Sequence, residues 1–76
     1  MNKSRRKRIN DSLDKLLSSR GQLQIALEEE KIALSNVPDD DDNEEKRDAM
    51  DDIITGLEDA ISSLNEAIDV LSGADF

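Results

Sequence analysis

Residues 54–74 read ITGLEDA-ISSLNEA-IDVLSGA, a seven-residue unit written three times with Ile first, Leu fourth and Ala last. A strand would need alternation by two, so this spacing predicts a helix. Its apolar stripe extends backwards in steps of three and four. The stripe holds Met50, Ile53, Leu57, Ala60, Leu64, Ala67 and Leu71, broadened by Ile54, Ile61 and Ile68. An isolated helix cannot bury such a face, so it must pack on another helix.

A second helix is predicted over residues 4–34. Its stripe comprises Ile9, Leu13, Leu16, Leu23, Leu27 and Leu34, with Arg20 and Glu30 in the two gaps. The phase is unchanged across Gly21, which favours one continuous helix over a break there. Ile25 and Ile32 lie opposite the stripe. A helix that is apolar on two sides usually contacts two neighbours, which predicts self-association.

Residues 35–43 form a predicted acidic turn between the helices. Pro38 cannot donate to a continuing helix and disfavours helical geometry at Val37. The carboxylates that follow suit a helix start, so we expect the N-cap between Asp40 and Asn43. The second helix then covers about residues 44–72, with Gly73 as its stop.

These elements predict an all-α protein: an antiparallel two-helix hairpin, coiled-coil-like, that pairs with a second copy into a four-helix bundle. Residues 1–8 are a basic N-terminal arm and residues 9–76 the hairpin domain. A turn centred near Asp39 puts Gly21 level with Gly56 and Arg20 level with Glu58 and Asp59. It also places Glu30 near Arg47 and Asp48, so both polar interruptions are expected to form register-setting salt bridges.

The net charge of −9 is unevenly distributed along the chain. Residues 1–20 carry seven basic and two acidic side chains, whereas residues 21–76 carry three basic and seventeen acidic ones. No apolar run approaches the length of a membrane span, and Asp11 and Asp14 stand where a signal peptide would need an apolar segment. We therefore expect a cytoplasmic protein without a membrane partner.

The residue content argues against catalysis. The chain has no His, Cys, Tyr or Trp, so its serines have no imidazole to act as base. A calcium loop of the EF-hand type counted from Asp39 would need Gly where Glu44 stands and Glu where Met50 stands. We predict no enzyme activity, no catalytic residues, no metal site and no cofactor.

Two charged clusters are the candidate binding sites. The acidic surface, expected to bind a protein partner, comprises Asp39, Asp40, Asp41, Asp42, Glu44, Glu45, Asp51 and Asp52. The basic cluster comprises Lys3, Arg5, Arg6, Lys7 and Arg8, and it opposes the dipole at the start of its helix. Pairing with Glu66, Asp69 and Asp75 is the favoured explanation. Phosphate or nucleic-acid binding by Arg5, Arg6, Lys7 and Arg8 is the alternative.

The residues expected to support self-association come from both helices. They are Leu13, Leu16, Leu23, Ile25, Leu27, Ile32, Met50, Ile53, Ile54, Leu57, Ile61, Leu64, Ile68 and Leu71.

Three features of the chain resemble a group of small uncharacterised helical-hairpin proteins from prophages and conjugative elements of Gram-positive bacteria. They are Asn36-Val37-Pro38, Arg47-Asp48-Ala49-Met50 and the repeats from Ile54 to Leu71. The Asp run departs from that group. The resemblance implies a phage or mobile-element origin and no established activity. It favours a self-associating binder of a protein partner, with an anti-defence inhibitor that mimics DNA as one alternative and a phosphate-ligand binder as another.

Overall fold

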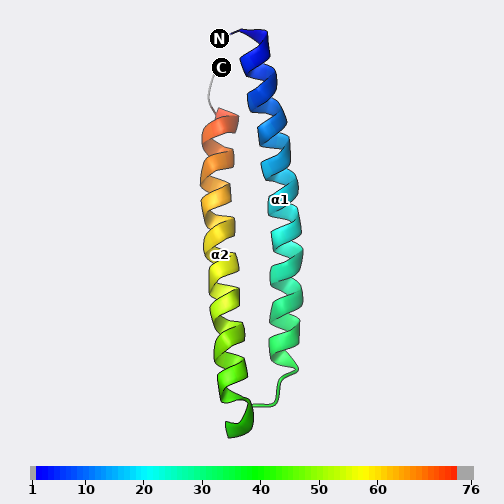
Figure 1. The fold of residues 1–76 in the computed structure, drawn as a ribbon, viewed down its shortest axis with the longest axis vertical. Coiled ribbons are helices and arrows are strands. Elements are labelled where there is room, and N and C mark those ends of the chain that lie inside the picture. The colour runs from blue at the N-terminus through cyan, green and yellow to red at the C-terminus, as the bar shows by residue number, and fades with distance from the viewer. Residues whose placement is uncertain (1, 74–76) are drawn as a thin grey trace.

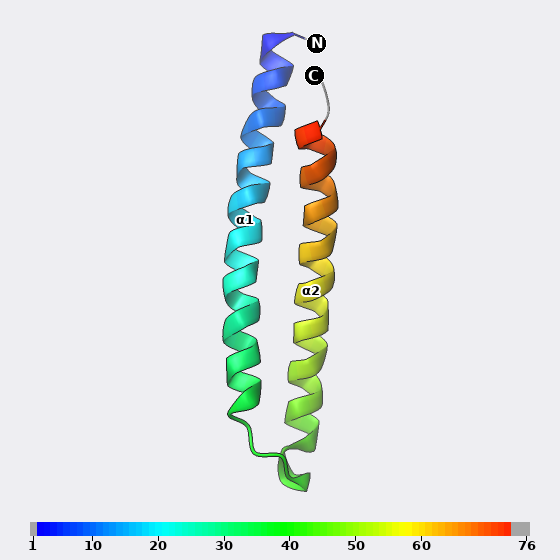
Figure 2. The ribbon, with the colours of Figure 1, turned by 180° about the vertical axis from the view of Figure 1, so that it is seen from behind.

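The computed structural model describes residues 2–73, which form an antiparallel helical hairpin (Figures 1 and 2). Helix α1 spans Lys3–Ser35, a short 3-10 helix η1 spans Asp41–Asn43, and helix α2 spans Glu44–Gly73. The Cα atoms extend over 60 × 14 × 14 Å. The radius of gyration is 17.5 Å, against about 11 Å for a compact domain of this length. The predicted all-α hairpin is confirmed.

Helix α1 is continuous through Gly21, as the unbroken phase of its stripe predicts. It begins one residue earlier than expected because Asn2 caps it. The Asn2 side chain accepts a hydrogen bond of 2.8 Å from the backbone N–H of Arg5. Because the helix begins at this cap, the residues of the basic cluster form the first turns of α1 and are not a separate arm.

Replacing Gly21 by Ala should stabilise the hairpin. A Cβ added at Gly21 would have no neighbour within 4 Å, so the methyl group meets no obstacle. Ala is better than Gly inside a helix by about 1 kcal/mol, and urea unfolding followed by circular dichroism should show that gain. Gln22→Ala is the control, with an expected change below about 0.5 kcal/mol. A less stable Gly21→Ala variant would mean that a close approach requires the glycine.

Helix α1 ends and α2 begins at the residues that the sequence predicts, next to Pro38 and after Asp40. The N–H groups of Asn36 and Val37 bond back to the last turn of α1, and the chain leaves the helix before Pro38. Asp40 then caps η1, because its carboxylate accepts hydrogen bonds from the Asn43 backbone N–H at 3.1 Å and the Asn43 side-chain amide at 2.7 Å. Asp40 thus caps the 3-10 turn that leads into α2, and α2 begins at Glu44, directly after the range predicted for its N-cap.

The core between the helices is small. Ile54, Ile61 and Ile68 are the buried residues of the described chain, and all three belong to α2. Around them lie half-buried residues of both helices. The apolar ones with a side chain are Ile9, Leu13, Leu16, Leu23, Ala26, Leu27 and Leu34 of α1, and Met50, Leu57, Leu64 and Leu71 of α2. We call Met50, Ile54, Leu57, Ile61, Leu64, Ile68 and Leu71 the inner stripe of α2.

The inner stripe corrects the phase expected for α2. The prediction put Ile53, Ala60 and Ala67 on the central line and Ile54, Ile61 and Ile68 beside it. In the structure the first three are exposed and the second three are buried. Both sets follow steps of three and four, so spacing alone does not separate them. Three isoleucines bury more apolar surface than one isoleucine and two alanines, which explains the rotation.

The register also differs from the one expected. The Arg20 guanidinium donates a hydrogen bond of 2.8 Å to the side-chain oxygen of Asn65, so these two residues lie level. The prediction put Arg20 beside Glu58 and Asp59, almost two turns away along α2. The predicted levels of Gly21 with Gly56 and of Glu30 with Arg47 fail for the same reason. The physical cause is the path of the turn, which runs past the end of α1 before α2 begins (Figure 1).

This register leaves an overhang at each end of the hairpin. The first turns of α1 extend beyond the end of α2, and the turn with the start of α2 extends beyond the end of α1 (Figures 1 and 2). The basic cluster is therefore not beside Glu66 or Asp69 as predicted. Asp75, the third expected partner, and Ala74, the last residue of the repeats, lie outside the described residues.

Candidate interaction surfaces

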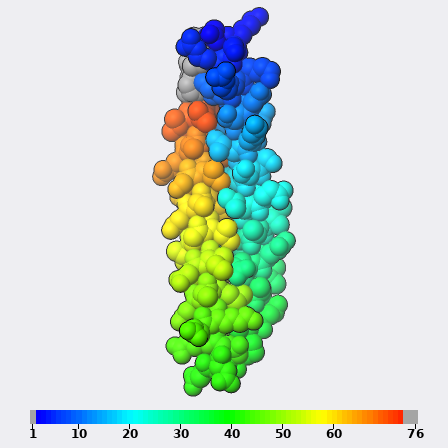
Figure 3. Space-filling view, in the orientation of Figure 1, coloured from blue at the N-terminus to red at the C-terminus, as the bar shows by residue number. Residues whose placement is uncertain are grey.

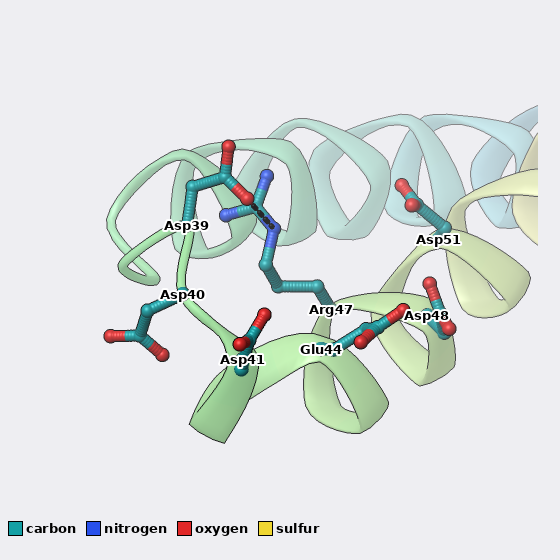
Figure 4. A pocket seen from close by; sticks show the side chains of 7 residues that line it. All are labelled: Asp39, Asp40, Asp41, Glu44, Arg47, Asp48 and Asp51. Atoms are coloured by element: carbon teal, nitrogen blue, oxygen red, sulfur yellow. Dashed lines mark ion pairs between the residues drawn. The ribbon is translucent and has the colours of Figure 1, made fainter.

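The acidic surface gathers at the turn end of the hairpin. Its eight predicted residues are all exposed. Part of it surrounds an open hollow lined by Asp39, Asp40, Asp41, Glu44, Arg47, Asp48 and Asp51 (Figure 4). Asp42, Glu45 and Asp52 are outside the hollow. The volume of about 330 Å³ is at the small end for ligand sites, and six of the seven lining side chains are carboxylates, with Arg47 as the seventh, instead of the usual apolar groups. The hollow suits a cationic surface better than a small molecule.

Arg47 holds this end together, a role that the sequence did not reveal. Its Nη1 donates a hydrogen bond of 2.7 Å to the backbone oxygen of Val37, and its Nε lies 4.0 Å from Asp39 Oδ1 (Figure 4). Arg47 thus ties the first turns of α2 to the chain that leaves α1. Asp39 is almost fully exposed, so the hydrogen bond to Val37 supplies most of the anchoring.

The basic cluster occupies the opposite end, where α1 extends past α2 (Figure 3). Its five side chains are exposed. Within residues 2–73, one of the five has an ion-pair partner: Lys7 Nζ lies 2.9 Å from Asp11 Oδ2 on the same helix. This hydrogen bond, helped by the charge of Asp11, raises the pKa of the Lys7 ammonium above its ordinary value. The remaining cations of the cluster face solvent in the part of the chain that is described.

The residues predicted for self-association divide into two groups. Eleven of them pack in the hairpin: Leu13, Leu16, Leu23, Leu27, Met50, Ile54, Leu57, Ile61, Leu64, Ile68 and Leu71. Ile25, Ile32 and Ile53 stay exposed, at 54%, 60% and 52%. Val70, which was not among the candidates, is 69% exposed. The exposed apolar residues therefore belong to the outer sides of both helices.

The exposed apolar residues of α2 form a second stripe beside the inner one. It runs in alternating steps of four and three through Ala49, Ile53, Gly56, Ala60, Ser63, Ala67 and Val70. Every member is exposed and uncharged. We call this set the outer stripe of α2. The outer stripe has the same spacing of three and four as the inner stripe, so the sequence could have revealed it. The isoleucines of the inner stripe are larger and more apolar, and they make the outer stripe easy to overlook.

Among residues 2–73, no group of three carboxylates is placed to hold a metal ion. Over the same residues, neither α1 nor α2 has a stretch long and apolar enough to cross a membrane. No protein-family model, curated protein or solved structure matches the chain. The fold and these surfaces define a helical hairpin with one basic end, one acidic end and an uncharged outer stripe.

Proposed function

We propose that this protein is a non-catalytic binding module that self-associates and binds a protein partner through its exposed surfaces. The observation that carries the proposal is that more large apolar side chains are exposed on the hairpin than are buried in it. Three isoleucines are buried, while Leu17, Ile25, Ile32, Ile53 and Val70 remain exposed. A hairpin of this size gains little from folding alone, so covering Ile53 and Val70, the two of these exposed side chains that lie on α2, would add to its stability.

The surface area supports self-association. The solvent-accessible area is 5711 Å² for a chain of 8.5 kDa. A compact monomer of that mass exposes about 4,700 Å². The excess of about 1,000 Å² per chain is comparable with the roughly 800 Å² that each partner of a standard interface buries. Pairing two hairpins into a four-helix bundle would remove most of it.

The non-catalytic part of the proposal rests on the environment of the titratable groups. None of the described charged side chains is buried, so no acid or base is held away from water in residues 2–73. Catalytic acids and bases are usually tuned by such burial or by a close charge partner. The open acidic hollow instead presents carboxylates on one rim, as a docking surface for a basic partner does.

Light scattering of the whole protein tests self-association. We expect a mass near twice 8.5 kDa, or a higher multiple, at low and at high salt. The assembly should persist in salt because apolar burial is not screened. A monomer at millimolar concentration in both conditions would contradict self-association. It would leave the apolar surfaces available to a different protein.

A phosphate-binding function is the second candidate, because the basic cluster forms a helical overhang with exposed cations. It predicts that changing Arg5, Arg6 and Arg8 to Gln abolishes salt-sensitive binding to a short oligonucleotide, while Asp39–Asp42 changed to Asn leaves it intact. If the protein is instead an inhibitor that mimics DNA, it should bind a basic nucleic-acid-binding protein. Changing Asp39–Asp42 to Asn should then abolish that binding, and changing Arg5, Arg6 and Arg8 to Gln should leave it intact. The phage or mobile-element origin remains a prediction from resemblance.

A further inference from the structure

We infer that the second copy pairs antiparallel with the first, through the outer stripe of α2, so that the basic end of each hairpin lies against the acidic end of the other. This inference rests on the proposed self-association and specifies its face and direction. Four features of the hairpin carry it: the symmetry of the outer stripe, the face to which the stripe belongs, the alignment of the charged ends and the sizes of the facing side chains.

The outer stripe is symmetric about Ala60. Ile53 and Ala67 lie seven residues on either side of it, and Ala49 and Val70, at the two ends, lie eleven residues before it and ten residues after it. When two such helices run antiparallel, Ile53 faces Ala67 and Val70 faces Ala49. Each large side chain then meets a small one, as close packing requires. A parallel pair would place Ile53 against Ile53, where the two side chains are crowded, and Ala60 against Ala60, where they leave a gap.

The outer stripe also belongs to a face that continues onto α1. Ile53, Ala60 and Ala67 each precede a buried isoleucine of α2 by one residue. Ser12, Ser19, Ala26 and Ala33 likewise each precede an inward-facing residue of α1 by one. Equivalent positions of two antiparallel helices lie on the same side of the pair. The α1 positions that flank α2 on this face are therefore uncharged, whereas those further out, which correspond to Ala49, Gly56, Ser63 and Val70 of α2, are Arg8, Lys15, Gln22 and Glu29. The opposite side carries Lys31, Asp51 and Glu58 together with uncharged residues such as Leu17 and Gln24.

The charged ends match in the same arrangement. Residues 3–8 carry five basic side chains and no acidic ones. Residues 39–52 carry nine acidic and two basic ones. Because Arg20 lies level with Asn65, an antiparallel pair centred on Ala60 puts residues 3–8 of one copy at about the same level along the helix axes as residues 39–44 of the other. The overhanging start of α1 then lies level with the overhanging turn of the second copy, twice per dimer. A parallel pair would instead place like charges together at both ends.

Thiol cross-linking tests the face and the direction separately. The chain has no cysteine, so each introduced one is unique. Ala60→Cys should form a covalent dimer with a short bismaleimide, and the matched Ser62→Cys, exposed but outside the outer stripe, should not. For direction, Ala49→Cys and Val70→Cys lie about 30 Å apart along α2. They should cross-link when the two variants are refolded together, and neither should cross-link alone.

Other outcomes separate the two proposals. Cross-linking of Ala49→Cys alone and of Val70→Cys alone would establish a parallel pair and overturn the inference. If Ser62→Cys cross-linked and Ala60→Cys did not, the interface would lie on another face, and the inference would again be overturned. In both cases self-association would stand. A monomeric mass without any cross-link would instead overturn the proposed self-association together with the inference.

Discussion

Replacing Ile68 by Ala should unfold most of the protein at low concentration. Ile68 is the most buried side chain described, at 4% exposed. Truncating a buried isoleucine costs about 2–5 kcal/mol, and the core of so small a domain supplies only about 3–5 kcal/mol. Ala is the better helix former, so the loss would report packing and not helix propensity. Urea unfolding at two protein concentrations, followed by circular dichroism, measures it and shows any contribution from association.

Ile32→Ala is the matched control for this experiment. The chemical change is the same, but Ile32 is 60% exposed on the outer side of α1. We expect a change within about 0.5 kcal/mol, as for most surface substitutions. Equal losses for the two variants would mean that the exposed face of α1 is also covered in solution. A small loss for Ile68→Ala would contradict the core described here.

The hydrogen bond between Arg20 and Asn65 should show a clear coupling energy in a double-mutant cycle. It is half-buried and joins the two helices, with a guanidinium as donor. A hydrogen bond that involves a charged group contributes about 1.5–3 kcal/mol, and residual solvent access lowers this. We therefore expect about 1–2 kcal/mol of coupling between Arg20→Ala and Asn65→Ala in the free energy of unfolding.

The same cycle with Glu58 provides the control. Glu58 is the residue that the sequence placed beside Arg20, and in the structure it lies almost two turns from Asn65 along α2. Coupling between Arg20→Ala and Glu58→Ala should therefore stay below about 0.5 kcal/mol. If Glu58 coupled and Asn65 did not, the register of the hairpin would be the predicted one, and the alignment of the charged ends would have to be revised.

The sequence by itself determined the helices, their ends and the turn. These features depend on interactions between near neighbours. The spacing of apolar residues predicts the helices, Pro38 closes the first one, and Asp40 supplies a cap three residues before Asn43. The continuity of α1 through Gly21 also follows from the phase of a single stripe. The two charged clusters are equally visible, because they are local in the chain.

Only the tertiary structure decided which side of α2 faces α1 and how far the two helices are shifted. Two stripes of α2 have the same spacing, so the choice depends on how much apolar surface each buries against the other helix. The shift depends on the route of the turn and on partners distant in the chain, such as Arg20 and Asn65. Both are set by contacts between residues far apart in sequence, and local periodicity carries no information about such contacts.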